Sequence, residues 1–288
     1  MIRLLFIVPY PELKEKVEYV LSRHPERKRL NADVQVMTVE NTPDVPSDEY
    51  DAVIARGYTA HKTLSAYTQA PTISISISGY DILRAVSECC GHYHPRKIAV
   101  IGFSGQLYEV KHICCFFHTE AVIYDSVSHE DLSATMETAL AAGCDAVIGG
   151  YSAAVLARQK GVPSIIIKTG EDALVRAVDE AILTVDQIRQ ERIVSHMYKT
   201  IIYASREGVL YVDAKGTIRV RNQAVRQMCG EVSLRNRPVR QALPCLWPVF
   251  HAVLQSGKEE AGRIVTIPGR KTTVSVPCTP DITNREMS

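Results

Sequence analysis

A stretch of ten residues that occurs twice constrains the fold more than any other feature of this sequence. Residues 51–60 read DAVIARGYTA, and residues 145–154 read DAVIGGYSAA. Each copy has an acidic residue, a short apolar run, then glycine, tyrosine, a hydroxyl residue and alanine. The likeness continues downstream, where residues 71–81 (PTISISISGYD) parallel residues 163–172 (PSIIIKTGED). This part of the chain is therefore an internal duplication.

The repeated pattern predicts parallel βα units, because short Val/Ile runs bounded by Gly and Pro are typical of strands covered on both faces. Two such halves facing each other make a cleft. In the first half, we expect strands near residues 2–8, 33–39, 52–55 and 72–76, and helices near 11–23, 59–68 and 80–91. In the second half, we expect strands near 96–101, 120–124, 146–149 and 164–167, and helices near 106–117, 129–142 and 152–159.

The pattern changes after the second half. Residues 171–205 contain neither Pro nor Gly, which favours one long helix whose first part has a wide apolar stripe. The second part of this helix could be a connecting rod that pairs with a partner chain. Residues 208–222 then alternate around an Asp-x-x-Gly turn, and residues 262–277 form a second hairpin around Pro-Gly. Antiparallel strands replace parallel ones, which predicts a second, α+β domain.

We therefore expect a ligand-sensing domain at residues 1–195 and a smaller, incomplete α+β domain at residues 196–288. The first domain would contain two subdomains and the long helix, at about 1–94, 95–170 and 171–205. A length of 288 residues is enough for two domains that each bury a core.

Composition points to a protein without a membrane or nucleic-acid partner of its own. Lys and Arg number 33 against 32 Asp and Glu, so the bulk charge favours neither an anionic membrane nor DNA. No apolar run approaches the roughly 20 residues that span a bilayer. The eight cysteines include no Cys-x-x-Cys pair and read as reduced thiols. We expect a soluble, cytoplasmic protein.

Arg56 is the leading candidate for a ligand contact. It follows an expected buried strand at the turn into a helix, where the duplicated copy has Gly150, so the scaffold does not require arginine there. Helix starts favour anions, and a guanidinium fork suits a carboxylate. The alternative is an arginine that pairs with an acidic neighbour across the cleft. Lys168, at the matching strand end of the second half, is a weaker candidate from the opposite wall, since most such lysines are solvated.

Several motifs resemble those of the receptor domain of the propionate catabolism activator family. They are residues 54–60, 78–84, 97–103, 147–150 and 169–172, and the resemblance covers roughly residues 1–190. The segment from Gly208 to Ala224 is similar to the opening hairpin and helix of a PAS domain.

These resemblances imply a fold and a function. The fold would be two flavodoxin-like subdomains around a ligand cleft, followed by the long helix and a PAS-like domain. The function would be the sensory region of a sigma-54-dependent transcription regulator. A small carboxylate-type effector would bind in the cleft, as 2-methylcitrate is implied to do in the best-known member. The chain would form a homodimer or higher oligomer. Contact with DNA and sigma-54 RNA polymerase would need an ATPase and helix-turn-helix module, of which this sequence carries neither motif.

The resemblance also implies ligand contacts at the other turns of the two halves. Ser and Gly are natural helix caps, so these residues can equally cap helices without binding anything. The positions are Gly57, Tyr58, Thr59, Ser78, Gly79, Tyr80, Phe103, Ser104, Gly105, Tyr151, Ser152 and Thr169.

Two other interpretations stay open. The chain could be a PAS-type dimerisation module with a vestigial cleft, or, with less support, an α/β enzyme. Racemases with duplicated halves place a cysteine at each strand end, whereas this chain has Arg56 and Gly150 there. We expect no catalytic residue, no metal site and no cofactor, because no Gly-x-Gly-x-x-Gly, Walker or flavin-type motif occurs.

Overall fold

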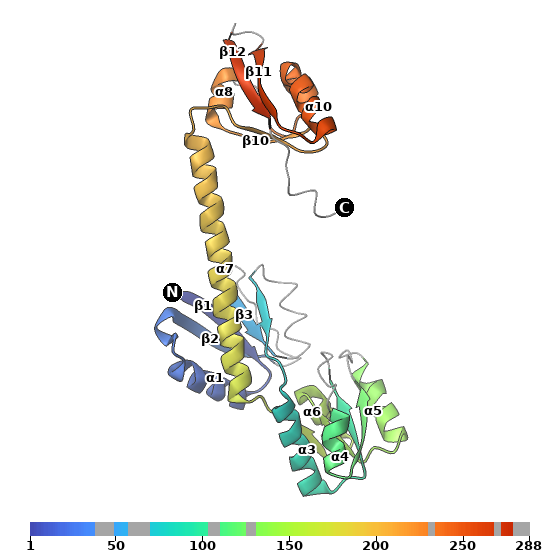
Figure 1. The fold of residues 1–288 in the computed structure, drawn as a ribbon. Helices are drawn as coiled ribbons and strands as arrows, with labels where there is room; N and C mark the ends of the chain where they lie inside the picture. The colour runs from blue at the N-terminus through green and yellow to red at the C-terminus, as the bar shows by residue number, and fades with distance from the viewer. Residues whose placement is uncertain are drawn as a thin grey trace. The chain divides into compact units, whose positions relative to one another are not determined.

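The computed structural model describes residues 1–37, 49–56, 70–102, 110–124, 131–229, 234–267 and 272–278. The chain divides into two compact units, Met1–Arg189 and Gln190–Ser288. Figure 1 shows the elements of both units. The expected domain boundary near residue 195 falls a few residues after this division.

A four-stranded parallel sheet forms the first half of unit 1. Its strand order is β2-β1-β3-β4, and Ile2 of β1 lies opposite Leu30 of β2. β1 is almost wholly buried, as expected for a central strand with both faces covered. The elements of this half are β1 (Ile2–Val8), α1 (Pro11–Arg23), a short 3-10 turn (Arg27–Arg29), β2 (Leu30–Val36), β3 (Ala52–Ala55) and β4 (Thr72–Ser74). β2 begins three residues before the expected strand because its pairing with β1 starts at Leu30.

A second parallel sheet repeats this topology, with the order β6-β5-β7-β8. In each sheet the first strand of the half is flanked by the second and third strands, and the fourth forms an edge. The two flavodoxin-like sheets expected from the duplication are thus confirmed. The elements of the second half are β5 (Lys97–Ile101), α4 (Val110–Phe116), β6 (Glu120–Tyr124), α5 (Leu132–Ala141), β7 (Ala146–Gly149), α6 (Tyr151–Gln159) and β8 (Ser164–Ile166).

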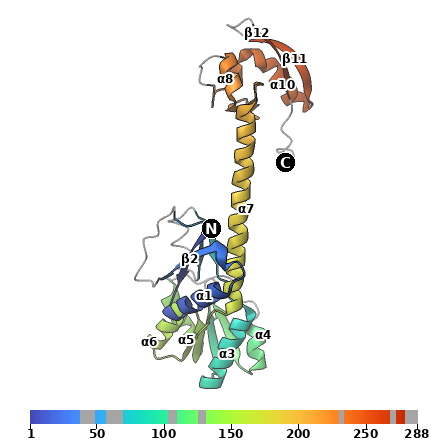
Figure 2. The same cartoon turned by 90° about the vertical axis from the view of Figure 1, so that its left-hand side faces the viewer.

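The two halves exchange their last helices. α3 (Gly79–Tyr93) follows β4 of the first sheet, but its apolar face packs on the second sheet, where Ile82 and Val86 join the core of Ile98 and Ile148. α7 (Glu171–Ala204) follows β8 of the second sheet and covers the first. Figures 1 and 2 both show α7 beside β1 and α1, and α3 beside α4. The expected subdomain boundary near residue 94 follows chain order and misses this exchange.

The repeated aspartate has the same structural role in both halves. The carboxylate of Asp51 accepts a hydrogen bond from the backbone N–H of Arg3 at the start of β1. The carboxylate of Asp145 accepts from the backbone N–H groups of Arg96 and Lys97 at the start of β5. Each aspartate therefore joins the beginning of the third strand of its half to the beginning of the first.

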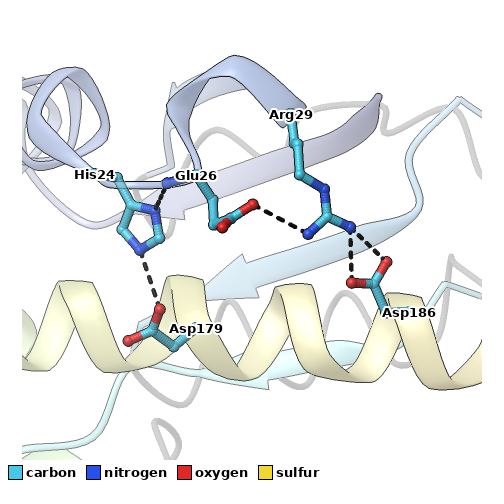
Figure 3. A network of polar contacts seen from close by, with 5 residues as sticks. All are labelled: His24, Glu26, Arg29, Asp179 and Asp186. Carbon is cyan, nitrogen blue, oxygen red and sulfur yellow. Dashed lines mark hydrogen bonds and ion pairs between the residues drawn. The ribbon is translucent and has the colours of Figure 1, made fainter.

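Polar contacts hold α7 against the connection from α1 to β2 (Figure 3). His24 is buried, and its Nε2 lies 3.1 Å from Asp179 Oδ1 of α7, while its Nδ1 accepts from the backbone N–H of Glu26. This acceptor role places the proton of the neutral ring on Nε2, where it faces Asp179. Two turns further along α7, Asp186 accepts two hydrogen bonds from Arg29, at 2.9 and 2.8 Å. The first half thus fixes the rotation of α7 at two points.

Unit 2 has antiparallel strands, as the sequence predicts. β9 (Leu210–Val212) pairs with β10 (Ile218–Arg221), and β11 (Glu260–Ile267) pairs with β12 (Thr272–Cys278). The helical elements are α8 (Gln223–Cys229), α9 (Val239–Ala242), a 3-10 turn (Pro244–Leu246) and α10 (Trp247–Ser256). A small core forms around Ile218, Val225 and Leu234. The likeness of this unit to a PAS domain stays a prediction.

Some expectations fall outside the described residues. They are the end of the strand at 33–39, the helix at 59–68, the starts of the helices at 106–117 and 129–142, and the last hairpin turn. Among the residues that are described, no helix is both long enough and apolar enough to cross a membrane.

Candidate functional site

The carboxyl ends of strands from both sheets meet in unit 1. Tyr10 follows β1 and Tyr151 follows β7, and their rings stack with centroids 6.0 Å apart at an interplanar angle of 25°. Arg56 follows β3, and Ile167 follows β8. In open parallel sheets, ligands bind beyond the carboxyl ends of the strands. The junction between the two halves is therefore the place in this unit to look for a ligand.

Arg56 is buried at this junction, with 9% of its surface exposed. Its Nη2 donates to the carbonyl of Ile167 in the other half, at 2.5 Å. Its Nη1 is buried and has no hydrogen-bond partner among the described residues. Burial lowers the pKa of the guanidinium from its ordinary value, and the neighbouring Tyr10 and Asp81 side chains act in the opposite direction. Within the described part of the chain, Nη2 is thus engaged by the Ile167 carbonyl, whereas Nη1 has no hydrogen-bond partner.

Three cationic side chains hold three consecutive carbonyls on the segment between β8 and α7. Besides the bond from Arg56 to Ile167, Arg84 of α3 donates to the carbonyl of Lys168 at 2.7 Å. Lys16 of α1 donates to the carbonyl of Thr169 at 2.9 Å. The donors come from three different elements. This crossover, residues 167–170, is therefore tied to both halves where α7 begins.

One carboxylate lies within this cluster of cations. Asp81 is fully buried at the start of α3. Its Oδ2 accepts from the backbone N–H of Ser78, while the Ser78 hydroxyl accepts from the backbone N–H of Asp81, which completes a capping box. Its Oδ1 accepts from Arg84 at 3.0 Å. Both carboxylate oxygens therefore have partners.

Gly170 brings the start of α7 close to Asp81. A Cβ at Gly170 would lie 3.0 Å from Asp81 Oδ1 and 2.5 Å from Asp172 Oδ1. Gly79, its counterpart in the duplication, has no atom within 4 Å of such a Cβ. The connection from β8 to α7 therefore requires a glycine for close approach, whereas the equivalent connection from β4 to α3 does not.

The structure places the expected site residues in different settings. Arg56 and Thr169 are buried at the junction, and Thr169 Oγ1 also has no partner among the described residues. Ser78 serves as a helix cap. Other expected site residues are partly or largely exposed, and of these Lys168 contributes its carbonyl to the cluster: Gly79, Tyr80, Tyr151, Ser152 and Lys168. Gly57, Tyr58, Thr59, Phe103, Ser104 and Gly105 lie outside the described residues.

Sequence reasoning missed Tyr10, Lys16, Asp81 and Arg84. Tyr10 could have been found because it follows the first strand, at the same sheet edge as Arg56. Asp81 stands at the third helical position after Ser78, the spacing of a capping box. Nothing local to Lys16 or Arg84 indicates that their partners are carbonyls at Thr169 and Lys168. Within the described part of the chain, no group of three or more His, Cys, Asp or Glu side chains could hold a metal ion.

Two duplicated parallel-sheet halves that exchange helices and meet at their strand ends define a two-lobed α/β fold of the sensor type. The chain belongs to the propionate catabolism activator family (PrpR_N), which it matches over residues 28–191. Membership of this activator family supports a regulatory role for this region of the chain.

Solved structures with a similar fold include an NtrC family transcriptional regulator from Clostridium acetobutylicum. It is 17% identical with a TM-score of 0.54, and the match covers 64% of this chain and 97% of that one. A LacI transcriptional regulator from a Rhodococcus species is 12% identical with a TM-score of 0.36, over 64% of this chain and 90% of that one. An aspartate racemase homologue from Pyrococcus horikoshii OT3 is 12% identical with a TM-score of 0.25, over 63% of this chain and 99% of that one. At 17% identity, the Clostridium acetobutylicum structure bears on the fold alone, and the other two, with TM-scores below 0.5, carry no argument. Among curated proteins, none matches the chain.

Proposed function

We propose that unit 1 is a receptor for a small carboxylate-type anion, which binds between its two halves and regulates transcription through α7 and unit 2. The observation that carries this proposal is the buried guanidinium of Arg56, whose Nη1 has no partner among the described residues. The name of the family adds propionate-related carboxylates to the candidate effectors.

An anion would satisfy a group that is costly to leave unpaired. A buried polar group without a hydrogen bond costs about 1–3 kcal/mol, and more when it is charged. Burial already lowers the pKa of Arg56, so its charge is poorly solvated in the unliganded protein. A carboxylate would accept from Nη1 and supply the missing counter-charge. Of the acidic residues described at the site, Asp81 is already engaged by Ser78 and Arg84, and the exposed Asp172 pairs with Arg176.

The same contacts offer a route for the signal. Arg56 donates to Ile167, and the crossover that follows leads directly into α7. α7 continues without interruption to Ala204, inside unit 2. An effector that draws Arg56 and the second half together would change the position of the first turn of α7. It shifts the conformational equilibrium only if it binds the closed form more tightly.

Binding without catalysis fits the chemistry of the site. Among the described residues of the site, the carboxylate of Asp81 has both oxygens engaged in hydrogen bonds, with Ser78 and with Arg84, so it is not free to act as a general base. We therefore propose a sensor that releases its effector unchanged.

A thermal-shift screen tests the proposal. The full chain is heated with propionate, 2-methylcitrate, citrate, other di- and tricarboxylates, and phosphate. A ligand at 100 times its Kd adds about 2.7 kcal/mol of stability, which corresponds to a rise of roughly 5 °C or more in Tm. Arg56→Gln should abolish the shift. Arg158→Gln, on an exposed residue of α6, is the matched control and should retain it. A shift that survives Arg56→Gln, or no shift with any carboxylate, would contradict the proposal.

A further inference from the structure

The two parts of α7 differ in what covers them. From Glu171 to Val185 the helix buries seven residues against the first sheet: Ala173, Leu174, Ala177, Val178, Ala181, Ile182 and Val185. From residue 190 to residue 204, where α7 belongs to unit 2, no residue is buried. The second part of α7 is nevertheless rich in large apolar side chains.

Most of these side chains, though not Ile202 and Tyr203, gather on one face. Ile193, Val194, Met197, Tyr198 and Ile201 form what we call the α7 stripe. At 100° per residue they fall within less than half of the helix circumference. Four of them are strongly exposed: Ile193 by 62%, Met197 by 47%, Tyr198 by 58% and Ile201 by 59%.

The opposite face of the same segment is mostly polar, although it also carries Tyr203, which is 56% exposed. It carries Arg192, Ser195, His196 and Lys199, which recur at intervals of three and four residues. An amphipathic helix with its apolar face in water is incomplete, because contiguous exposed apolar surface marks an interaction site. The α7 stripe therefore calls for a partner.

We propose that the partner is a second copy of this chain, which pairs its α7 stripe with the first in a parallel two-stranded coiled coil. The spacing supports this partner. Val194 and Ile201 take the a positions of a heptad, and Met197 and Ala204 take the d positions. β-branched residues at a favour two parallel strands over larger assemblies. A heptad stripe of this kind is complementary to itself in a two-fold dimer.

Charge and area agree with self-association. Within residues 190–204, Glu191 takes an e position beside the seam. Arg192 and Lys199 both take f positions, which point away from a coiled-coil partner, so their like charges do not oppose pairing. A large side chain buries about 150–250 Å². Since the side chains of the α7 stripe are about half exposed, pairing would bury roughly 500 Å² of their surface per chain. The total of about 1,000 Å² per dimer is the lower limit of a specific interface. We therefore expect a dimer that dissociates on dilution.

Sedimentation of the full chain over a wide range of concentrations tests the pairing. The wild-type protein should form a dimer in a concentration-dependent way, and Met197→Glu combined with Ile201→Glu should sediment as a monomer. Lys199→Glu, on the opposite face, is the control and should remain a dimer. Circular dichroism checks that α7 is retained in each variant. A wild-type monomer at all concentrations, which would leave the stripe for a different protein, or a dimer that survives the double substitution, overturns the proposal.

A cross-link tests the parallel arrangement and does not depend on a destabilising charge. In a Cys115→Ser background, which removes an exposed native thiol, Met197→Cys should oxidise readily to a covalent dimer. The d positions of the two chains lie opposite each other only in a parallel pair. Ser195→Cys, on the polar face, should not cross-link. Equal cross-linking of both variants, or none of Met197→Cys, would contradict the arrangement. Neither experiment requires an effector, so its outcome is independent of the proposed receptor function.

Discussion

Arg56 donates from Nη2 to the backbone carbonyl of Ile167, which lies 111 positions later in the chain and in the other half of unit 1. The same guanidinium presents Nη1 to its surroundings without a partner among the described residues. One side chain thus connects a candidate anion contact to the crossover that leads into α7. This is the physical basis for a receptor in which binding and signalling begin at the same residue.

If the role of Arg56 is to bind a ligand, its replacement should lower the stability of the unliganded protein only slightly. Arg56→Met keeps much of the side-chain volume and relieves the desolvation of the charge, but it leaves the Ile167 carbonyl unpaired. The relieved desolvation of the buried charge offsets the cost of about 1–3 kcal/mol for leaving the Ile167 carbonyl unpaired. We expect the free energy of unfolding to stay within about 1 kcal/mol of wild type, measured by urea denaturation followed by circular dichroism. A loss of about 3 kcal/mol or more would identify a structural arginine instead.

The connection from β8 to α7, which contains Gly170, should tolerate alanine less well than the connection from β4 to α3, which leads into Gly79. Gly170→Ala places a methyl group 3.0 Å from the buried carboxylate of Asp81, which its hydrogen bonds hold in position. Asp172, although nearer, is a flexible exposed side chain that can move away. We expect a destabilisation of about 1–3 kcal/mol from this overpacking.

Gly79→Ala is the matched control for Gly170→Ala. The two glycines are equivalent in the duplication, and a Cβ at Gly79 meets no atom within 4 Å. Its stability should change by only a few tenths of a kcal/mol, since alanine favours the helix. Calorimetric unfolding of the two variants measures the difference. Equal effects would mean that close approach at Gly170 is not the cause.

Asn222 should be essential to the stability of unit 2. Its side chain is fully buried, and Nδ2 donates to the carbonyls of Ile202, at the end of α7, and Glu207. Its Oδ1 accepts from the backbone N–H groups of Val209 and Val225. Asn222→Ala leaves these groups unsatisfied, and we expect a cost of about 3 kcal/mol.

The fluorescence of Trp247, the only tryptophan of the chain, reports unfolding of unit 2 in urea. Gln223→Ala, at the exposed neighbouring position, serves as the control and should leave the transition unchanged. If Asn222→Ala unfolded at the same urea concentration as Gln223→Ala, the hydrogen bonds around Asn222 would not be stabilising.

The cysteines should differ in reactivity. Burial raises the pKa of Cys89 to about 12 and that of Cys114 to about 11, whereas Cys115 is exposed. The thiolate is the reactive form, so iodoacetamide at pH 8 should modify Cys115 and spare the other two until the protein unfolds. Peptide mass spectrometry measures each site. Modification of Cys89 at the rate of Cys115 in the folded protein would contradict its burial.

The same shifts give a pH dependence with a definite sign. In the unfolded chain these thiols lose their protons near the ordinary pKa of 9.0, while the folded protein keeps them. The unfolded state then binds fewer protons, so stability falls as the pH rises from about 9 to about 12. Replacing Cys89 with Ala should flatten this decline in urea unfolding curves. An unchanged slope would assign the decline to other groups.

Much of the fold could be predicted from the sequence because the duplication repeats strand, turn and helix signals in one order. The repeated aspartates even have equivalent roles: Asp51 accepts a hydrogen bond from the backbone at the start of β1, and Asp145 accepts two from the backbone at the start of β5. The exchange of α3 and α7 could not be predicted. An apolar helix face such as that of Ile82 and Val86 shows that the helix packs on a sheet, but the two sheets have equivalent apolar surfaces.

The site was predictable in part for the same reason. Arg56 stands out because it departs from Gly150 in the other copy, a comparison that the sequence itself supplies. The contacts of Lys16 and Arg84 depend on backbone carbonyls of the second crossover. A carbonyl has no sequence signature, so side chains that recognise carbonyls across a long chain separation remain invisible until the halves are assembled.

The distance between the two halves, measured with and without effector, tests the receptor account most directly. Spin labels would be placed on Glu15→Cys of α1 and Gln159→Cys of α6, both exposed, in a Cys115→Ser background. The account predicts that a carboxylate found in the thermal-shift screen shortens this distance by several ångström, as in hinge closure around a ligand, and that Arg56→Gln removes the change. An unaltered distance at saturating effector would contradict it.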